Sequence, residues 1–189
     1  MLYFHAYGIP LSDIDDIIAA ARDWAGQRMA LATVIEASGS APRPRGGHML
    51  LAADGRFAGS ISGGCVEYEI FAIAEGVIAG NPASVHHYGS TDPSVWLPGL
   101  PCGGQIGIMV QPVAPEGFAP DLFEDIARAR AGGAPMALST DLATGKTERG
   151  ERDGHFVNVY EPPRRLLIVG AVQIAQAPSA IARATGLAV

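Results

Sequence analysis

Hydrophobic residues near the start of the chain follow two different spacings. Between residues 13 and 25, apolar side chains recur every three or four positions, which is the spacing of one face of a helix. Residues 29–38, MALATVIEAS, nearly alternate between apolar and polar and include β-branched residues, so they predict a strand. Two short apolar runs then flank Asp54-Gly55, a pair that favours a tight hairpin turn. The first third of the chain therefore predicts a helix, a strand and a β-hairpin.

The same two spacings continue to residue 160. Apolar residues between Cys65 and Gly80 repeat at three and four positions, and a second stretch of this kind covers residues 121–133. Further strands are expected at residues 83–90, 105–113, 134–141 and 154–160. Because helices alternate with strands, we expect an α/β or α+β domain over residues 1–160. The hairpin makes mixed strand directions the expectation for its sheet.

A boundary is predicted at residues 160–165, YEPPRR. Two adjacent prolines cannot continue a helix, and each lacks a backbone hydrogen-bond donor. Residues 164–189 then have the pattern of a buried strand, a tight turn, a helix and the start of another apolar strand. The sequence thus predicts one domain at 1–160 and a short second unit at 164–189.

Composition narrows the class of protein. Hydrophobic residues make up 48% of the chain and charged residues only 17%, against a usual charged share of about 25%. Such a chain should fold compactly and cover some of its surface by self-association, so a homo-oligomer is expected. The net charge of −6 and the lack of a basic run exclude a nucleic-acid-binding surface.

The location of the protein is predicted from what the sequence lacks. No basic stretch precedes an apolar run at the N-terminus, and no apolar window approaches the length of a membrane span. We therefore expect a cytoplasmic protein without a membrane segment. The chain holds two cysteines, which in a reducing compartment are expected to be thiols.

Each thiol lies beside a pair of glycines. Cys65 follows Gly63 and Gly64 at the point where a helix is expected to begin, and the positive end of a helix favours a thiolate. Glycines allow a sharp bend and the close approach of a ligand. This pattern favours a reactive or metal-binding thiolate beside a small anion site. The alternative is a glycine turn followed by a small buried cysteine.

Cys102 precedes Gly103 and Gly104 and follows a proline-rich stretch, which should place it in a loop. The two thiols could share one site. A structural zinc ion would need two further ligands. The candidates, none at a spacing typical of zinc sites, are His48, His86, His87 and Glu67. Since His86 and His87 are adjacent in an expected strand, they should face opposite sides of the sheet.

Three charged residues precede or follow the first glycine pair, and each can be explained without a role in a site. Glu67 lies in the first turn of the expected helix, where a carboxylate stabilises the helix without any role in a site. Arg43 and Arg45 could hold an anionic group, because guanidinium groups match phosphate oxygens, or could simply be solvated. Whether both arginines point the same way depends on the local backbone conformation.

Three segments together resemble a known family. GSAPRPRGGHMLLAADGRFAGSISGGCVE, then CGGQIGIMVQPV, then RLLIVGAVQIAQ are similar to the XdhC/CoxI family of accessory proteins for molybdenum hydroxylases. The similarity is close over residues 28–113. It implies an N-terminal domain with these motifs at residues 1–160, followed by a Rossmann-like domain of which residues 164–189 are an incomplete βα(β) fragment.

The resemblance also implies a function. Family members bind molybdenum cofactor, support its sulfuration, and hand it to a hydroxylase such as xanthine dehydrogenase or carbon monoxide dehydrogenase. The chain is thus expected to be a non-catalytic chaperone, with a molybdenum hydroxylase apo-enzyme and a cysteine desulfurase as partners. In this interpretation Cys65 and Cys102 face the metal or its exchangeable sulfur. The other residues expected to contact the cofactor are Gly63, Gly64, Gly103, Gly104, Arg43 and Glu67.

The C-terminal segment departs from a dinucleotide-binding pattern. The motif G-x-G-x-x-G/A needs glycine at its third position so that the backbone can approach the pyrophosphate, and Val172 stands there. Pro178 falls within the expected helix, where only the first turn should accept it. An NAD(P)-dependent oxidoreductase is one alternative function. Val172 counts against it, so no binding of NAD(H) is expected. A thiol-redox or zinc protein that uses Cys65 and Cys102 is the other.

Overall fold

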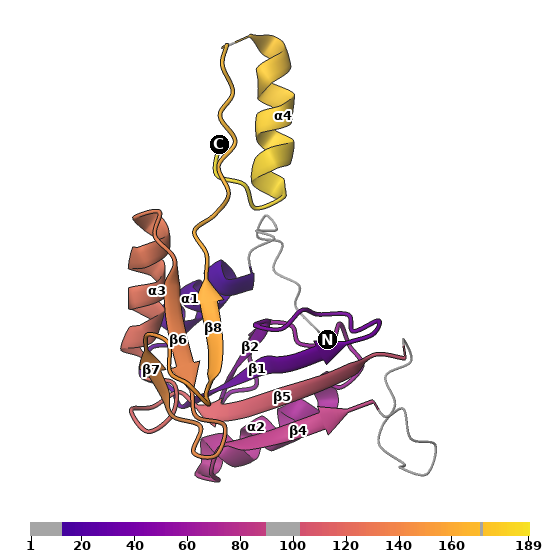
Figure 1. Ribbon diagram of the computed structural model, residues 1–189, viewed down its shortest axis with the longest axis vertical. Coiled ribbons are helices and arrows are strands. Elements are labelled where there is room, and N and C mark those ends of the chain that lie inside the picture. Colours follow the sequence, from indigo (N-terminus) through magenta and orange to yellow (C-terminus); the bar gives the residue numbers. More distant parts are fainter. Residues whose placement is uncertain (1–12, 90–102, 171) are drawn as a thin grey trace.

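The computed structural model of the protein describes residues 13–89, 103–170 and 172–189, and these form two β-sheets and four helices (Figure 1). The elements are α1 (Asp13–Asp23), β1 (Met29–Ser38), β2 (His48–Ala52), β3 (Phe57–Gly59), α2 (Glu67–Ala79), β4 (Ser84–Tyr88), β5 (Gln105–Pro112), α3 (Asp121–Ala131), β6 (Met136–Thr140), β7 (Thr147–Arg149), β8 (Phe156–Tyr160) and α4 (Gln173–Ala184). Among the described helices, none has the length and apolar character to span a membrane.

The predicted mixed α and β domain is confirmed, but the strand directions differ from the expectation. Every pairing among the eight described strands is antiparallel. The reason is that β5 pairs with β1 in the opposite direction, in the same way as the hairpin strand β2 does on the other side. Strand β7 was not predicted, because its three residues, Thr-Glu-Arg, have no apolar alternation.

The larger sheet has the strand order β3-β2-β1-β5-β4, and its central strand is buried on both faces. On β1, Ala32 and Val34 belong to the cluster with the buried side of α2, whereas Met29 and Leu31 belong to the cluster with α1 and α3. Since successive strand residues point to opposite faces, α2 covers one face, and α1 and α3 lie on the opposite one (Figure 1). The smaller sheet, β7-β6-β8, packs on that second side.

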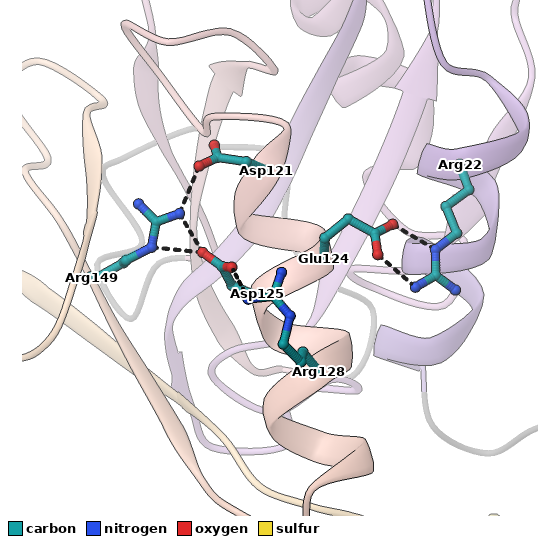
Figure 2. A network of polar contacts seen from close by, with 6 residues as sticks. All are labelled: Arg22, Asp121, Glu124, Asp125, Arg128 and Arg149. Carbon is teal, nitrogen blue, oxygen red and sulfur yellow. Dashed lines mark hydrogen bonds and ion pairs between the residues drawn. The ribbon is translucent and has the colours of Figure 1, made fainter.

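Arginine–carboxylate pairs tie α3 to its neighbours on the surface. Arg22 of α1 donates to both carboxylate oxygens of Glu124, at 2.6 and 2.9 Å (Figure 2). Arg149 of β7 donates to Asp121 and Asp125, each at 2.6 Å. All of these side chains except Asp125 are well exposed, so solvent screens the pairs and each contributes little to stability. The network orients α3, and none of its residues lines the small cleft beside Gln105.

The connections that carry the sequence motifs leave one end of the larger sheet. Register places Ser38, the last residue of β1, opposite Gln105, the first residue of β5. Tyr88, the last residue of β4, lies opposite Ile106, and Gly59, the last residue of β3, lies opposite Met49 near the start of β2, where β2 leaves the proline-rich connection from β1. The turns that follow β1 and β3 and the turn that precedes β5 are therefore neighbours at this end, although the sequence separates them widely.

The C-terminal segment stands away from the two sheets (Figure 1). Arg165 and Ala188 form an isolated parallel bridge on either side of α4, and the Leu166 N–H donates to the Ala188 carbonyl at 2.7 Å. Within the described residues 164–170 and 172–189, neither side of α4 forms a strand beyond this bridge, so the buried strand that the sequence predicted after residue 164 is not formed. The apolar side chains of the segment are largely uncovered, with Leu167 86% and Val169 91% exposed. The division at residues 160–164 and the Rossmann-like assignment remain predictions.

Pro178 lies in the interior of α4, as the sequence indicated, and not in the first turn, where a proline is ordinarily tolerated. Its ring nitrogen has no hydrogen to donate to the carbonyl of Ile174, one turn earlier. Ile174 is 81% exposed, so water can reach this side of the helix and hydrate the carbonyl. Solvent exposure explains why the helix continues past the proline to Ala184.

Candidate functional site

Two loops and a glycine pair meet at the end of the larger sheet. The proline loop, residues 39–47, follows β1, and the cysteine loop, residues 60–66, joins β3 to α2. A β-carbon placed on Gly104 would lie 2.5 Å from the backbone nitrogen of Ala41, and one placed on Gly63 would lie 4.0 Å from Cβ of Pro42. The proline loop therefore contacts both predicted glycine pairs and joins them into one region.

The glycines of this region are required by geometry. Gly63 and Gly64 have φ angles of +74° and +111°, in the left-handed region that side chains rarely enter. Gly104 lies against the backbone of residues 40 and 41, where a β-carbon would overlap main-chain atoms. The predicted sharp bend before Cys65 is thus present, and the second pair allows two loops to pass at close range.

The carboxylate of Glu67 is hydrogen-bonded to the cysteine loop that precedes it. Its carboxylate accepts hydrogen bonds from the backbone N–H of Ser62 at 2.9 Å, from the N–H of Gly64 at 2.8 Å and from the hydroxyl of Ser60 at 3.0 Å. The Ser62 hydroxyl also donates to it. A single side chain from the first turn of α2 therefore fixes three residues of the loop that precedes the helix.

The N–H groups of Gly63, Cys65 and Val66 in the cysteine loop also have internal hydrogen-bond partners. The N–H groups of Cys65 and Val66 donate to the Ser62 hydroxyl, both at 3.0 Å, and the Gly63 N–H donates to the Ser60 hydroxyl at 3.1 Å. The small anion site expected beside Cys65 is therefore wrong in its simple form. The anion at the start of α2 is the carboxylate of the protein itself, and the loop amides are already occupied.

The hydrogen bonds keep Glu67 ionised. Partial burial alone would raise the pKa of its carboxyl group, but the side-chain and backbone hydrogen bonds from Ser62, with that from Gly64, outweigh burial and lower the pKa to about 2. At neutral pH Glu67 is consequently a fixed negative charge at the helix N-terminus, which the helix dipole favours.

Cys65 is an exposed free thiol. The alternative of a small buried cysteine is therefore wrong, since the next residue, Val66, is the one that enters the core. Cys102 lies outside the described residues, but Gly103 and Gly104, which follow it, belong to the region. The described part of the site thus presents one sulfur donor beside two glycine pairs.

The two arginines of the proline loop point in different directions. The Arg43 Nε donates to the carbonyl of Ser60 at 3.2 Å, which links the proline loop to the cysteine loop. The Arg45 Nε donates to the carbonyl of Ile35 at 3.1 Å, and its guanidinium carbon lies 4.5 Å from the centre of the Phe156 ring. Arg43 alone therefore lies at the site, and the two do not form a shared clamp for an anion.

His48, a candidate zinc ligand, is buried between the two sheets. Its Nδ1 lies 2.9 Å from the Thr33 hydroxyl, and its Nε2 lies 3.0 Å from the Tyr160 hydroxyl and 3.3 Å from the Asn158 side-chain nitrogen. Burial lowers its pKa to about 4, so the ring is neutral. Both ring nitrogens are engaged by protein groups, which leaves His48 a structural residue that ties β2 to β8.

The other two histidines face opposite sides of β4, as predicted. His86 Nε2 lies 2.8 Å from the Ser84 hydroxyl, and His87 Nε2 lies 3.5 Å from a carboxylate oxygen of Glu36. Within residues 13–89, 103–170 and 172–189, no group of three or more His, Cys, Asp or Glu side chains is arranged to hold a metal ion. These ranges therefore do not assemble the zinc site that the sequence left open.

A small cleft opens beside the glycine pair that follows Cys102. It has a volume of about 170 Å³, and its polar lining includes Glu36, His87 and Gln105. Gly89 also lines it, and a β-carbon there would lie 2.2 Å from the carbonyl oxygen of Gly104. The cleft offers hydrogen-bond donors and acceptors to a polar ligand at the same end of the sheet as the thiol.

The sequence did not identify Ser60 and Ser62 as part of the site. A capping box places Glu three residues after Ser or Thr, whereas Glu67 stands five residues after Ser62. Two left-handed glycines lengthen the connection and let the same reciprocal bonding form. The available signal was a serine pair before a Gly-Gly turn, followed by a glutamate at the helix start.

Comparison with known proteins supports the resemblance seen in the sequence. The model of the XdhC and CoxI family matches residues 24–89, which include both loops. The molybdenum cofactor insertion chaperone PaoD of Escherichia coli (strain K12) is 31% identical over 166 residues, which cover 85% of this chain and 51% of that protein. The chain therefore spans about half the length of the curated relative it matches. The predicted relation to the XdhC/CoxI family is confirmed.

A solved structure shares the fold. The crystal structure described as a xanthine dehydrogenase from Bacillus halodurans superposes with a TM-score of 0.63 and 23% sequence identity. The match covers 82% of this chain and 54% of the other. At this level of identity the similarity concerns the arrangement of helices and strands alone.

Proposed function

Since residues 24–89 belong to the XdhC and CoxI family, we propose that the protein is a molybdenum cofactor chaperone. In this role it holds the cofactor as cargo, supports its sulfuration and delivers it to a molybdenum hydroxylase of the xanthine dehydrogenase or carbon monoxide dehydrogenase type. The name of the Escherichia coli relative supports the cofactor as cargo. The protein binds and transfers, and no catalytic residue is assigned.

One observation carries the proposal, which is the exposed Cys65 thiol on a loop whose N–H groups from Ser62 to Val66 all have hydrogen-bond partners. Thiolates are ligands for soft metal centres, and the cofactor combines such a centre with an anionic pterin. We assign Cys65 as the sulfur donor that faces the metal. Cys102 is proposed as the second donor, because Gly103 lies beside the same proline loop, with its carbonyl oxygen 3.5 Å from the β-carbon position of Gly39.

The groups around the thiol have separate proposed roles. Gly63, Gly64 and Gly103 leave room for a flat ligand to approach the backbone, whereas Gly104 gives its space to the proline loop that crosses it. Arg43 holds the proline loop against the cysteine loop by donating to the Ser60 carbonyl. We propose that it lines the cradle, meaning the surface formed by these two loops and the glycine pair at 103–104, on which the pterin would lie. Glu67, expected to contact the cofactor, has its carboxylate turned to the loop.

The proposal also names partners and a compartment. The acceptor is a hydroxylase apo-enzyme, and a cysteine desulfurase is the proposed sulfur source. An accessible thiol that must remain reduced fits the cytoplasm. Self-association is kept as a prediction, supported by the uncovered apolar side chains of the C-terminal segment.

The test is cofactor retention by the purified protein. The chain is isolated without oxygen from a host that makes the cofactor, and released pterin and molybdenum are quantified against protein. We expect stoichiometric cofactor, a strong loss in Cys65→Ala, and a similar loss in Cys65→Ser, because a hydroxyl is a poor donor for a soft metal. Thermal melting should be unchanged in both. Full retention by the serine variant would refute the assignment of Cys65.

The two alternatives predict different results in the same preparation. An oxidoreductase would bind NADH, yet Val172, at the N-cap of α4, places a branched side chain where a pyrophosphate would approach. We expect no saturable NADH binding by fluorescence. A thiol-redox protein would be isolated with a Cys65–Cys102 disulfide and no pterin, and this outcome would overturn the chaperone proposal.

A further inference from the structure

We infer that Glu67 is a positioning residue that occupies the backbone amides of the cysteine loop, holds the Cys65 thiol outward, and keeps the anionic groups of the cargo away from those amides. This inference rests on the proposed function and deepens it. In this arrangement the Cys65 thiol faces the molybdenum centre of the proposed cofactor, and the phosphate of the cofactor lies elsewhere at the site.

The carboxylate of Glu67 has no capacity left for a ligand. An ionised carboxylate offers about four lone-pair directions. Here it accepts four hydrogen bonds, two from backbone N–H groups and two from the hydroxyls of Ser60 and Ser62. A direct bond from the cofactor to Glu67 would break one of these. Its contribution therefore passes through the loop.

Ser62 connects the carboxylate to the cysteine. Its buried hydroxyl donates to Glu67 and accepts from the N–H groups of Cys65 and Val66, which uses its hydrogen and both lone pairs. Gly64 is bonded to Glu67 on one side of the cysteine, and Val66 is packed in the core on the other. With both neighbours fixed, the backbone of Cys65 has one position, and its side chain faces solvent.

The charge of Glu67 limits which end of the cargo can lie here. Amides at a helix N-terminus bind phosphate when they have no other partner. In the cysteine loop the Ser62 and Gly64 amides are bonded to the negative carboxylate of Glu67, which a phosphate would meet at close range. The amides of Gly63, Cys65 and Val66 are bonded to serine hydroxyls. The sulfur atom of Cys65 is the group that remains available, and it suits the metal end.

The first test reads the loop amides directly and needs no cofactor. Backbone amide resonances of Ser62 and Gly64, whose N–H groups donate to Glu67, are followed by NMR while sodium acetate is added to wild type, Glu67→Ala and the control Glu75→Gln. Glu75→Gln removes one carboxylate charge from the exposed side of the same helix. We expect a saturable shift in Glu67→Ala only, because acetate replaces the missing carboxylate. An absence of response in a folded Glu67→Ala protein would overturn the inference.

The second test measures cofactor retention in the same variants. Loss of a group that orients a metal ligand typically weakens metal binding about 10- to 100-fold. We expect a loss of this size in Glu67→Ala, partial recovery when acetate is present, and none of these effects in Glu75→Gln. Full retention by Glu67→Ala would overturn the inference. If wild type itself holds no cofactor, the proposed function fails, whereas the acetate titration still decides the role of Glu67.

A third variant covers the case in which Glu67→Ala does not fold. Glu67→Gln keeps the shape of the side chain but turns one acceptor oxygen into an NH₂ group, which cannot accept from both Ser62 and Gly64. We expect one of these two amide resonances to shift and cofactor retention to fall. Unchanged resonances together with unchanged retention would refute the positioning role.

Discussion

Acidification should destabilise the protein through His48. The ring is completely enclosed between the two sheets, and burial lowers its pKa from the ordinary value of 6.5 to about 4. The folded protein therefore binds this proton more weakly than the unfolded chain does. The stability contributed by neutral His48 is complete above about pH 6.5 and is lost as the pH falls toward 4.

The size of the effect follows from the difference between the two pKa values. A gap of about 2.5 units corresponds to about 3.4 kcal/mol if it is fully expressed. At intermediate pH only part of this appears, so the expected loss relative to neutral pH is about 1 kcal/mol by about pH 5.5 and about 3 kcal/mol by about pH 4. Losses of this size are a large share of the stability of a typical domain.

The assay is urea unfolding of wild type and His48→Gln at several pH values. Glutamine does not titrate, so its curve of unfolding free energy against pH should lack the contribution of His48. At neutral pH the variant should be less stable by about 1–2 kcal/mol, because part of the hydrogen bonding with Thr33 and Tyr160 is lost. The two curves should therefore meet between about pH 5.5 and about pH 5, and wild type should be the less stable protein at lower pH.

Subtraction of the two curves removes the other titrating groups. His86 and several surface carboxylates also have shifted pKa values, and both proteins share them. A constant difference between wild type and His48→Gln from pH 7 to about pH 5 would refute the reasoning. It would mean that the buried ring is protonated in the folded protein without cost.

Three further predictions concern other parts of the fold. Gly104→Ala should destabilise the protein by about 1–3 kcal/mol in urea unfolding, since its β-carbon would overlap the backbone of Ala41. Arg149→Ala should lower the melting temperature only slightly, because the ion pairs are exposed, and the decrease should be smaller still at high salt. Trypsin should cleave first at Arg164 or Arg165, where the chain is irregular and exposed; protection of this site in a monomer would contradict the prediction.

The elements of the fold could be predicted from the sequence because their apolar spacing is local. The helix that begins near Cys65 and the hairpin at Asp54 were placed within a few residues of their observed limits. The order of strands was a different matter. The pairing of β1 with β5 depends on residues far apart in the chain, for example Ser38 with Gln105, and no local pattern records it.

The candidate site was predictable in outline only. The position of Cys65 at a helix start and the bend at Gly63 follow from residue types. The role of Glu67 does not, because it depends on two left-handed residues that bring the carboxylate under the loop. The divergence of Arg43 and Arg45 likewise depends on backbone angles that the sequence leaves open.

The crossing of the proline loop over Gly104 sets the order of events during folding. The proline loop and the cysteine loop both lie within residues 39–66. Gly103 and Gly104 join them only when β5 pairs with β1. Pairings between distant segments form late, because the intervening chain must first be closed into a loop. A partly synthesised or misfolded chain would therefore lack an assembled cradle. Under the proposed function, cargo loading would then act as a checkpoint, because only molecules with a complete larger sheet could bind and deliver the cofactor.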